Sequence, residues 1–419
     1  MYTAGPTNYV YDYYMQNQHR LLHRNIKLFG VYQIFTKRVF MPLMTIYAVE
    51  QAGLNIQQIG IIAMLSSILG LISDSPTGYW ADRHGRKRSS QVGAFLTATG
   101  SLVYVFSNNI AGILFASLLS ALGYSFLYGS MQALIHDTLI VLKKENEYSK
   151  IASRAQALSL IGNAIFIGFV PLLYPIDRRL PFLLGFFAYC SLFIIATLLH
   201  EPERPKVHHS QKLSFVQTVR LFVHKKTLLF YLSIGVIFAT GTSTSDVFNL
   251  GLIDLGMPVK FLGFAFAAGS IFGAIVGLHI HRLKKFKFET FALIDFCFSF
   301  FPFIAYGITR SLPVALVSLI LSMATWRFEI IMYQHYILDV YRDTHYKATV
   351  LSLLTNFRSL QEIWMTLVIT GAAQHFGVLS SIGYGTLFML ALLPVLLYSV
   401  KNFSTNARAS SESLNQLVA

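Results

Sequence analysis

Ionisable side chains stand inside long apolar stretches of this sequence. A charged group in lipid costs about 2.5–3.5 kcal/mol on insertion scales, so such groups are rare and usually functional. Such residues bind charged partners or exchange protons. We therefore treat these residues as candidate substrate-binding or coupling residues: Lys37, Arg38, Arg327, Glu329, Arg358 and Glu362, with Asp246 nearer the end of its stretch. Asp295 is a further ionisable residue deep in a stretch.

Polar residues follow one face of the stretch 347–374. Arg358 lies one turn from Glu362, which predicts an ion pair within one helix. A shorter polar stripe in the stretch 151–174 includes Asn163. Polar stripes in membrane helices face a cavity or a partner rather than lipid, so we expect them to line a shared aqueous chamber. The stripe in 347–374 repeats at three- and four-residue steps: Ser352, Thr355, Ser359, Glu362, Thr366 and Thr370.

The deep charges do not balance. Four are basic (Lys37, Arg38, Arg327 and Arg358) and two are acidic (Glu329 and Glu362) in three of the stretches. One interpretation is a positive chamber that accepts an anionic or carboxylate-bearing solute. The alternative is that structural ion pairs neutralise the charges. Arg327 and Glu329 are too close in sequence to face each other on a helix, so at least one needs a partner elsewhere.

A short cationic segment, 78–88, separates two of the apolar stretches and reads Gly-Tyr-Trp-Ala-Asp-Arg-His-Gly-Arg-Lys-Arg. Basic loops alone fix membrane topology. The ordered spacing of glycines, acid and bases is more specific than that. The residues that define it are Gly78, Asp82, Arg83, Gly85, Arg86 and Lys87.

The composition places most of the chain in lipid. Of 419 residues, 54% are apolar and 12% are charged, whereas soluble domains carry about 25% charged residues. A spanning helix needs about 20 apolar residues. Twelve such stretches predict an all-α membrane protein: 27–49, 57–79, 89–107, 110–139 (as one tilted helix), 151–174, 180–199, 227–252, 258–280, 289–309, 312–338, 347–374 and 379–400.

The basic residues predict the topology. With the N-terminus in the cytoplasm, 25 Lys and Arg fall in cytoplasmic segments and only four in outer loops, as the positive-inside rule requires. Both termini are then cytoplasmic. The net charge of +14 is explained by these loops, without nucleic acid. The hydrophilic segment 201–226 separates two six-helix halves, 27–200 and 227–401, and the tails are 1–26 and 402–419.

The segment 78–88 resembles the loop between the second and third helices of the major facilitator superfamily of transporters. A weaker echo begins at Gly277. The resemblance implies two pseudo-symmetric six-helix bundles with substrate handled between them, and a gating role for the loop. It also implies that Gly78 allows close helix packing and that Asp82 meets a helix start in the other half. Arg86 would pair with an acid on the fourth helix, where Asp137 is the candidate.

The resemblance implies a secondary active transporter of a small organic solute, not an enzyme, working by alternating access. We expect coupling to protons through Glu329, Glu362 or Asp246. No metal-ligand spacing and no Gly-rich nucleotide loop are present, so we expect no cofactor and no ATP hydrolysis. We also expect a monomer in a bacterial inner membrane.

Two other functions remain open. A multidrug–proton antiporter would fit the abundant Phe and Tyr, but the Arg usual early in helix four and the Gly-Pro element of helix five are absent from 110–137 and 162–171. A non-transporting sensor with the same fold would have no need of an intact gate loop and deep charges. A membrane enzyme would need a clustered nucleophile or metal set.

Overall fold

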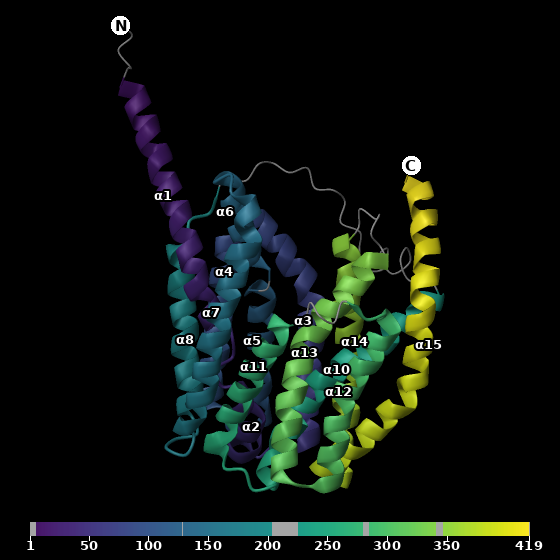
Figure 1. Ribbon diagram of the computed structural model, residues 1–419. Coiled ribbons are helices and arrows are strands. Elements are labelled where there is room, and N and C mark those ends of the chain that lie inside the picture. The colour runs from purple at the N-terminus through teal and green to yellow at the C-terminus, as the bar shows by residue number, and fades with distance from the viewer. Residues whose placement is uncertain (1–5, 128, 203–224, 280–284, 341–346, 419) are drawn as a thin grey trace.

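The computed structural model describes residues 6–127, 129–202, 225–279, 285–340 and 347–418. Helices make up nearly all of this part (Figure 1). The first half contains α1 (Pro6–Phe35), η1 (Met41–Leu43), α2 (Met44–Ala52), α3 (Ile56–His84), α4 (Arg86–Phe106), α5 (Ile110–Leu127), α6 (Ser130–Val141), η2 (Glu145–Glu147), α7 (Tyr148–Phe169), η3 (Val170–Leu173) and α8 (Leu180–Leu198). The second half contains α10 (Lys225–Asp254), η4 (Val259–Phe261), α11 (Leu262–Leu278), α12 (Phe288–Thr309), α13 (Leu312–Val340), α14 (Lys347–Phe376) and α15 (Val378–Val418).

Each predicted apolar stretch contains helix, and eight segments of the described chain are long and apolar enough to cross a membrane. They are Ile56–His84, Ile110–Val141, Glu145–Leu173, Leu180–Leu198, Leu228–Ser245, Val259–Gly277, Phe288–Thr309 and Val378–Phe403. The chain is therefore a multi-pass membrane protein. The count of twelve spans and the cytoplasmic termini stay predictions.

The first apolar stretch is not one continuous helix. α1 ends at Phe35, and η1 starts again only at Met41. Pro42 lies in the first turn of η1. In a continuous helix its ring would clash with the carbonyl of Arg38, so the helix breaks there. The break falls in the middle of the stretch 27–49 and places Lys37 and Arg38 on non-helical backbone.

The stretch 110–139 is also interrupted, which corrects the prediction of one tilted helix. α5 ends at Leu127 and α6 begins at Ser130. Gly129 stands before α6 with φ of 78°, a left-handed conformation that glycine adopts at little cost. Thr138 and Asp137 therefore belong to a separate short helix.

α1 begins and α15 ends at the same end of the molecule (Figure 1), here called the termini end. The two halves pack against each other through α3 with α14 and through α7 with α11. If the halves are related by the predicted two-fold repeat, α3 corresponds to α11 and α7 to α14, so the two contacts are equivalent. Most of the predicted linker 201–226 lies outside the described residues.

The two halves are in close contact at the far end, opposite the termini. There the Ile56 amide donates to Gln374 Oε1 at 3.1 Å. A Cβ on Gly60 would lie 1.9 Å from Thr370 Oγ1, and one on Gly263 would lie 2.1 Å from the Ile167 carbonyl oxygen. Only glycine allows the helices to approach this closely.

Candidate functional site

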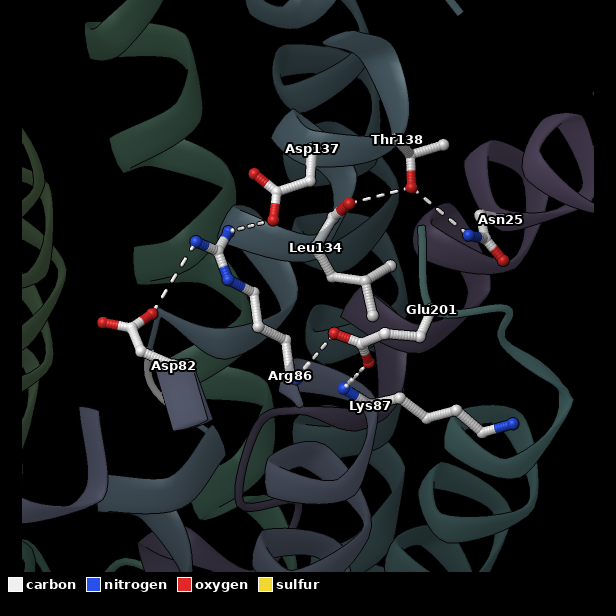
Figure 2. Close-up of polar contacts among 8 residues, drawn as sticks. All are labelled: Asn25, Asp82, Arg86, Lys87, Leu134, Asp137, Thr138 and Glu201. Atoms are coloured by element: carbon white, nitrogen blue, oxygen red, sulfur yellow. Dashed lines mark hydrogen bonds and ion pairs between the residues drawn. The ribbon is translucent and has the colours of Figure 1, made fainter. Parts of the chain in front are cut away.

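Arg86 lies between two carboxylates at the termini end of the first half (Figure 2). Its guanidinium is 3.0 Å from Asp137 on α6 and 3.8 Å from Asp82 on α3. All three side chains are largely buried, at 17–26% exposed. The predicted Arg86–Asp137 pair is confirmed. Arg86, at the start of α4, thus connects α6 with the end of α3.

Glu201 completes this group, a role that was not predicted from the sequence. Its two oxygens accept from the backbone amides of Arg86 at 2.9 Å and Lys87 at 2.7 Å. These amides open α4 and have no partner within the helix, and a carboxylate favours the positive end of a helix dipole. Asp82, Arg86, Lys87, Asp137 and Glu201 are called the loop cluster below. Glu201 thus ties the start of the predicted linker to the predicted gate loop.

Gly85 makes this geometry possible. It joins α3 to α4 with φ of 106°, a backbone conformation that residues other than glycine rarely adopt. A Cβ at this position would also lie 3.4 Å from the Glu201 carboxylate. The second glycine of the motif is therefore required by the backbone turn.

We expect Glu201→Gln to loosen the first turn of α4. The substitution removes a charged acceptor from a helix N-terminus, an interaction worth about 0.5–2 kcal/mol. Hydrogen exchange of the Arg86 and Lys87 amides should quicken by a few-fold to about 30-fold. Glu147→Gln, at an exposed acid on the same side of the molecule, is the control. Unchanged exchange at both amides would contradict the capping role.

Asn25 forms a second link at the same end. It is fully buried, and its Nδ2 donates to Thr138 Oγ1 at 3.2 Å and to the His200 carbonyl at 2.7 Å. The His200 amide donates back to Asn25 Oδ1 at 2.9 Å. α1, α6 and the segment after α8 are therefore joined beside the loop cluster (Figure 2).

The other motif residues have different surroundings. Arg83 is exposed. A Cβ on Gly78 would meet no described atom within 4 Å, and close helix packing at this glycine stays a prediction. The expected contact of Asp82 with a helix start in the other half stays a prediction, because the side chains at the start of α14 lie outside the described part.

Arg38 lies at the break in the first stretch. Its guanidinium carbon is 4.5 Å from the centre of the Tyr124 ring on α5, a cation–π distance. The Tyr124 hydroxyl is 2.5 Å from that of Tyr189 on α8. Within the described part of the chain, no carboxylate forms an ion pair with Arg38. Lys37, its neighbour, is exposed.

Arg358 and Glu362 form the predicted pair on α14, with Nε and Oε2 3.9 Å apart. Two residues further along this stripe, Thr366 and Thr370, lie in helix contacts. Thr366 is buried and donates to Ser243 on α10 at 3.1 Å, and Thr370 is buried against Gly60. The far end of the stripe therefore packs against other helices rather than lining a chamber.

Glu329 lies inside the second half. It is 4% exposed and accepts from Ser299 on α12 at 2.6 Å. Its described hydrogen-bond partner is on a helix of its own half, and the substrate-binding or coupling role of Glu329 stays a prediction. Asn163 is also buried, and its Oδ1 has no described hydrogen-bond partner. The side chains of Asp246 and Arg327 lie outside the described part.

The described residues contain no group of three or more His, Cys, Asp or Glu side chains that could hold a metal ion. The arrangement offers charged and hydrogen-bonding groups at several depths of a helical bundle. Such an arrangement can bind and orient a solute and hold a proton.

The fold and these buried charges define a multi-pass helical transporter built from two halves. The Major Facilitator Superfamily family model matches residues 28–364, so the chain belongs to that family and is a transporter rather than an enzyme. It is 24% identical to the uncharacterized MFS-type transporter YxaM of Bacillus subtilis, over 86% of this chain and 91% of that protein. It is 22% identical to multidrug resistance protein 2 of Bacillus subtilis, over 46% of this chain and 48% of that protein.

Solved structures share the fold. The nucleoside transporter NupG superposes with a TM-score of 0.76 at 13% identity, covering 91% of this chain and 98% of that one. A bacterial homologue of the human lysosomal transporter Spinster, in an inward-facing and unoccupied conformation, superposes with a TM-score of 0.66 at 14% identity. It covers 94% of this chain and 98% of that one.

Proposed function

We propose that this chain is a proton-coupled secondary transporter that moves a small organic solute carrying an anionic group. The observation that carries this proposal is Arg38, a charged side chain at a helix break within the predicted first span, with aromatic partners and no described carboxylate. A charge in that position costs free energy unless a partner offsets it. A solute carboxylate or phosphate supplies the missing partner.

Broken helices suit this role. A solute-binding site of secondary transporters lies near the bilayer midplane, where an interrupted helix exposes backbone and charge. Residues 36–40 form such an interruption. The ring of Tyr124 supports the guanidinium from one side, and Arg38 is half-buried rather than enclosed. In this proposal a ligand approaches the guanidinium from the side that Tyr124 does not cover.

The contacts along single helices support alternating access. Gly60 and Gly78 lie about five turns apart on α3 and so share a face, yet only Gly60 would place a Cβ against the other half. On α11, Gly263 is close to Ile167, whereas Gly277, almost four turns away, has no described atom within 4 Å. Within the described residues, the halves are therefore in contact at these glycines of the far end and not at those nearer the termini end. If the termini are cytoplasmic, this is the inward-facing state.

The loop cluster acts as the gate in this proposal. Arg86 and Asp137 make the start of α4 and α6 one rigid unit, and Glu201 attaches the predicted linker to that unit. Movement of one half relative to the other then moves the loop as a whole. The proposed location is a bacterial inner membrane, with the protein acting as a monomer.

A solute panel tests the function. The purified protein is screened by thermal shift against organic anions, neutral analogues of the same size and amphiphilic cations, and ligands that stabilise it are then tested by counterflow in proteoliposomes. We expect anions to stabilise the protein and to exchange across the membrane. Counterflow of amphiphilic cations alone would instead favour the multidrug antiporter, and binding without counterflow would favour a sensor.

A further inference from the structure

Two buried carboxyl groups face each other between α12 and α13. Asp295 is fully buried and Glu329 is 4% exposed. The hydroxyl of Tyr333, one turn beyond Glu329, donates to Asp295 Oδ2 at 3.0 Å. The hydroxyl of Ser299, one turn beyond Asp295, donates to Glu329 Oε1 at 2.6 Å. Each helix thus supplies a carboxyl group and a hydroxyl donor to the other.

The surroundings of the pair are apolar. Tyr333 contacts the rings of Phe291, Phe288 and Phe238, with centres 5.3–5.8 Å apart. Two full negative charges in such a place would repel each other and lose their hydration. The two carboxyl groups are near enough to act electrostatically on each other, and Asp295 Oδ1 has no hydrogen-bond partner in the described part of the molecule.

Among the described side chains, no basic group forms an ion pair with Asp295 or Glu329. Arg358 on α14 is near enough to act electrostatically on Glu329, and it forms an ion pair with Glu362. From α10, α11 and α15, no described ionisable side chain forms an ion pair with either carboxyl group. The side chain of Arg327, on α13 itself, lies outside the described part.

We propose that Asp295 and Glu329 together bind one proton and form the proton-carrying site of the transporter. The bound proton is shared between Asp295 Oδ1 and the Glu329 carboxyl, which gives the unpartnered oxygen its hydrogen bond and leaves one negative charge on the pair. Ser299 and Tyr333 hold the remaining oxygens. This proposal rests on the proposed proton-coupled function and assigns its coupling ion to a site.

Release of the proton changes the packing. Loss of H⁺ to water leaves two carboxylates side by side, which repel and favour separation of α12 from α13 or entry of water. Rebinding of H⁺ restores the hydrogen bond. A proton therefore biases the arrangement of two helices of the second half, as a coupling ion must.

Infrared difference spectroscopy of the reconstituted protein tests the site without any solute. Between low and high pH, the unsubstituted protein should show a buried carboxyl that gains and loses one proton. Asp295→Asn and Glu329→Gln should each remove that signal, because an amide beside one carboxylate mimics the singly protonated pair permanently. Glu289→Gln, an acid in the first turn of the same helix, should keep it.

Other results would overturn the proposal. The site is wrong if the signal survives in both carboxyl variants, or if Na⁺ rather than pH changes it. If both variants fail to fold, Ser299→Ala and Tyr333→Phe keep both carboxyl groups and should each move the pH midpoint of the signal, whereas an unmoved midpoint contradicts the proposal. Transport separates this inference from the proposed function: the carboxyl variants should lose uptake driven by a pH gradient but retain counterflow. A protein that transports nothing yet shows the signal would refute the function alone.

Discussion

Replacing Gly263 with valine is expected to open the far end of the molecule. A Cβ at this position would lie 2.1 Å from the Ile167 carbonyl oxygen and 2.7 Å from that of Gly168. Both are backbone atoms, which cannot rotate away as a side chain can. Overpacking costs about 1–3 kcal/mol, so the ratio of the two conformations should change by about 5- to 150-fold.

Distances between spin labels measure this shift. Labels at Ile176 in the first half and Ile308 in the second, both 74% exposed, report the separation of the halves at the far end. The two native cysteines, Cys190 and Cys297, are first replaced with serine. We expect a longer distance to become the major population in Gly263→Val.

The control is Gly385→Val, a glycine of α15 with nothing within 4 Å of its would-be Cβ. Its distance distribution should match that of the unsubstituted protein. An unchanged distribution in Gly263→Val would mean that the far end does not open, and alternating access would lose its structural support. Gly60→Val, at the equivalent contact between α3 and α14, should act in the same direction.

Local contacts were predictable from the sequence, because they depend on helix periodicity or on an ordered motif. The pair of Arg358 with Glu362 follows from a spacing of one turn. The pair of Arg86 with Asp137 follows from the family's loop. The break in the first helix also had a signal in Pro42, because the proline ring clashes with the carbonyl four residues earlier and kinks or breaks a helix.

Contacts between distant helices were not predictable in the same way. Asp295 and Ser299 share a helix face, as do Glu329 and Tyr333, so the spacing of each pair is visible in the sequence. Which face meets which helix depends on the rotation and height of α12 against α13. That register is set by the packing of many side chains, and a single sequence does not contain it.

Glu201 shows the same limit in a polar segment. Its charge gave no sign of its role, because the amides that it caps are 114 and 115 residues away in the chain. A carboxylate that follows one helix and caps another becomes visible only when the backbone places both ends together. Polar residues at helix ends are for this reason the part of the site that the sequence describes least.

Replacing Arg38 with glutamine is expected to weaken binding of the anionic solute by about 10- to 100-fold. A hydrogen bond to a charged group contributes about 1.5–3 kcal/mol, and 1.4 kcal/mol corresponds to a factor of ten in affinity. Arg38→Lys keeps the charge but loses the planar group that lies over Tyr124. Its affinity for the solute should therefore lie between that of the unsubstituted protein and that of Arg38→Gln. Equilibrium binding of the labelled solute to purified protein measures these differences.

Comparing an anionic ligand with a neutral analogue tests whether Arg38 contacts the solute directly. If the guanidinium pairs with the solute anion, Arg38→Gln should weaken binding of the anion and leave binding of a neutral analogue nearly unchanged. If Arg38 only holds the broken helix through Tyr124 and Tyr189, both ligands should weaken together. Arg179→Gln, at an exposed arginine of the far end, should alter neither. Equal losses for anion and neutral analogue would therefore assign Arg38 a structural role, and the anion proposal would fail even though the protein still transports.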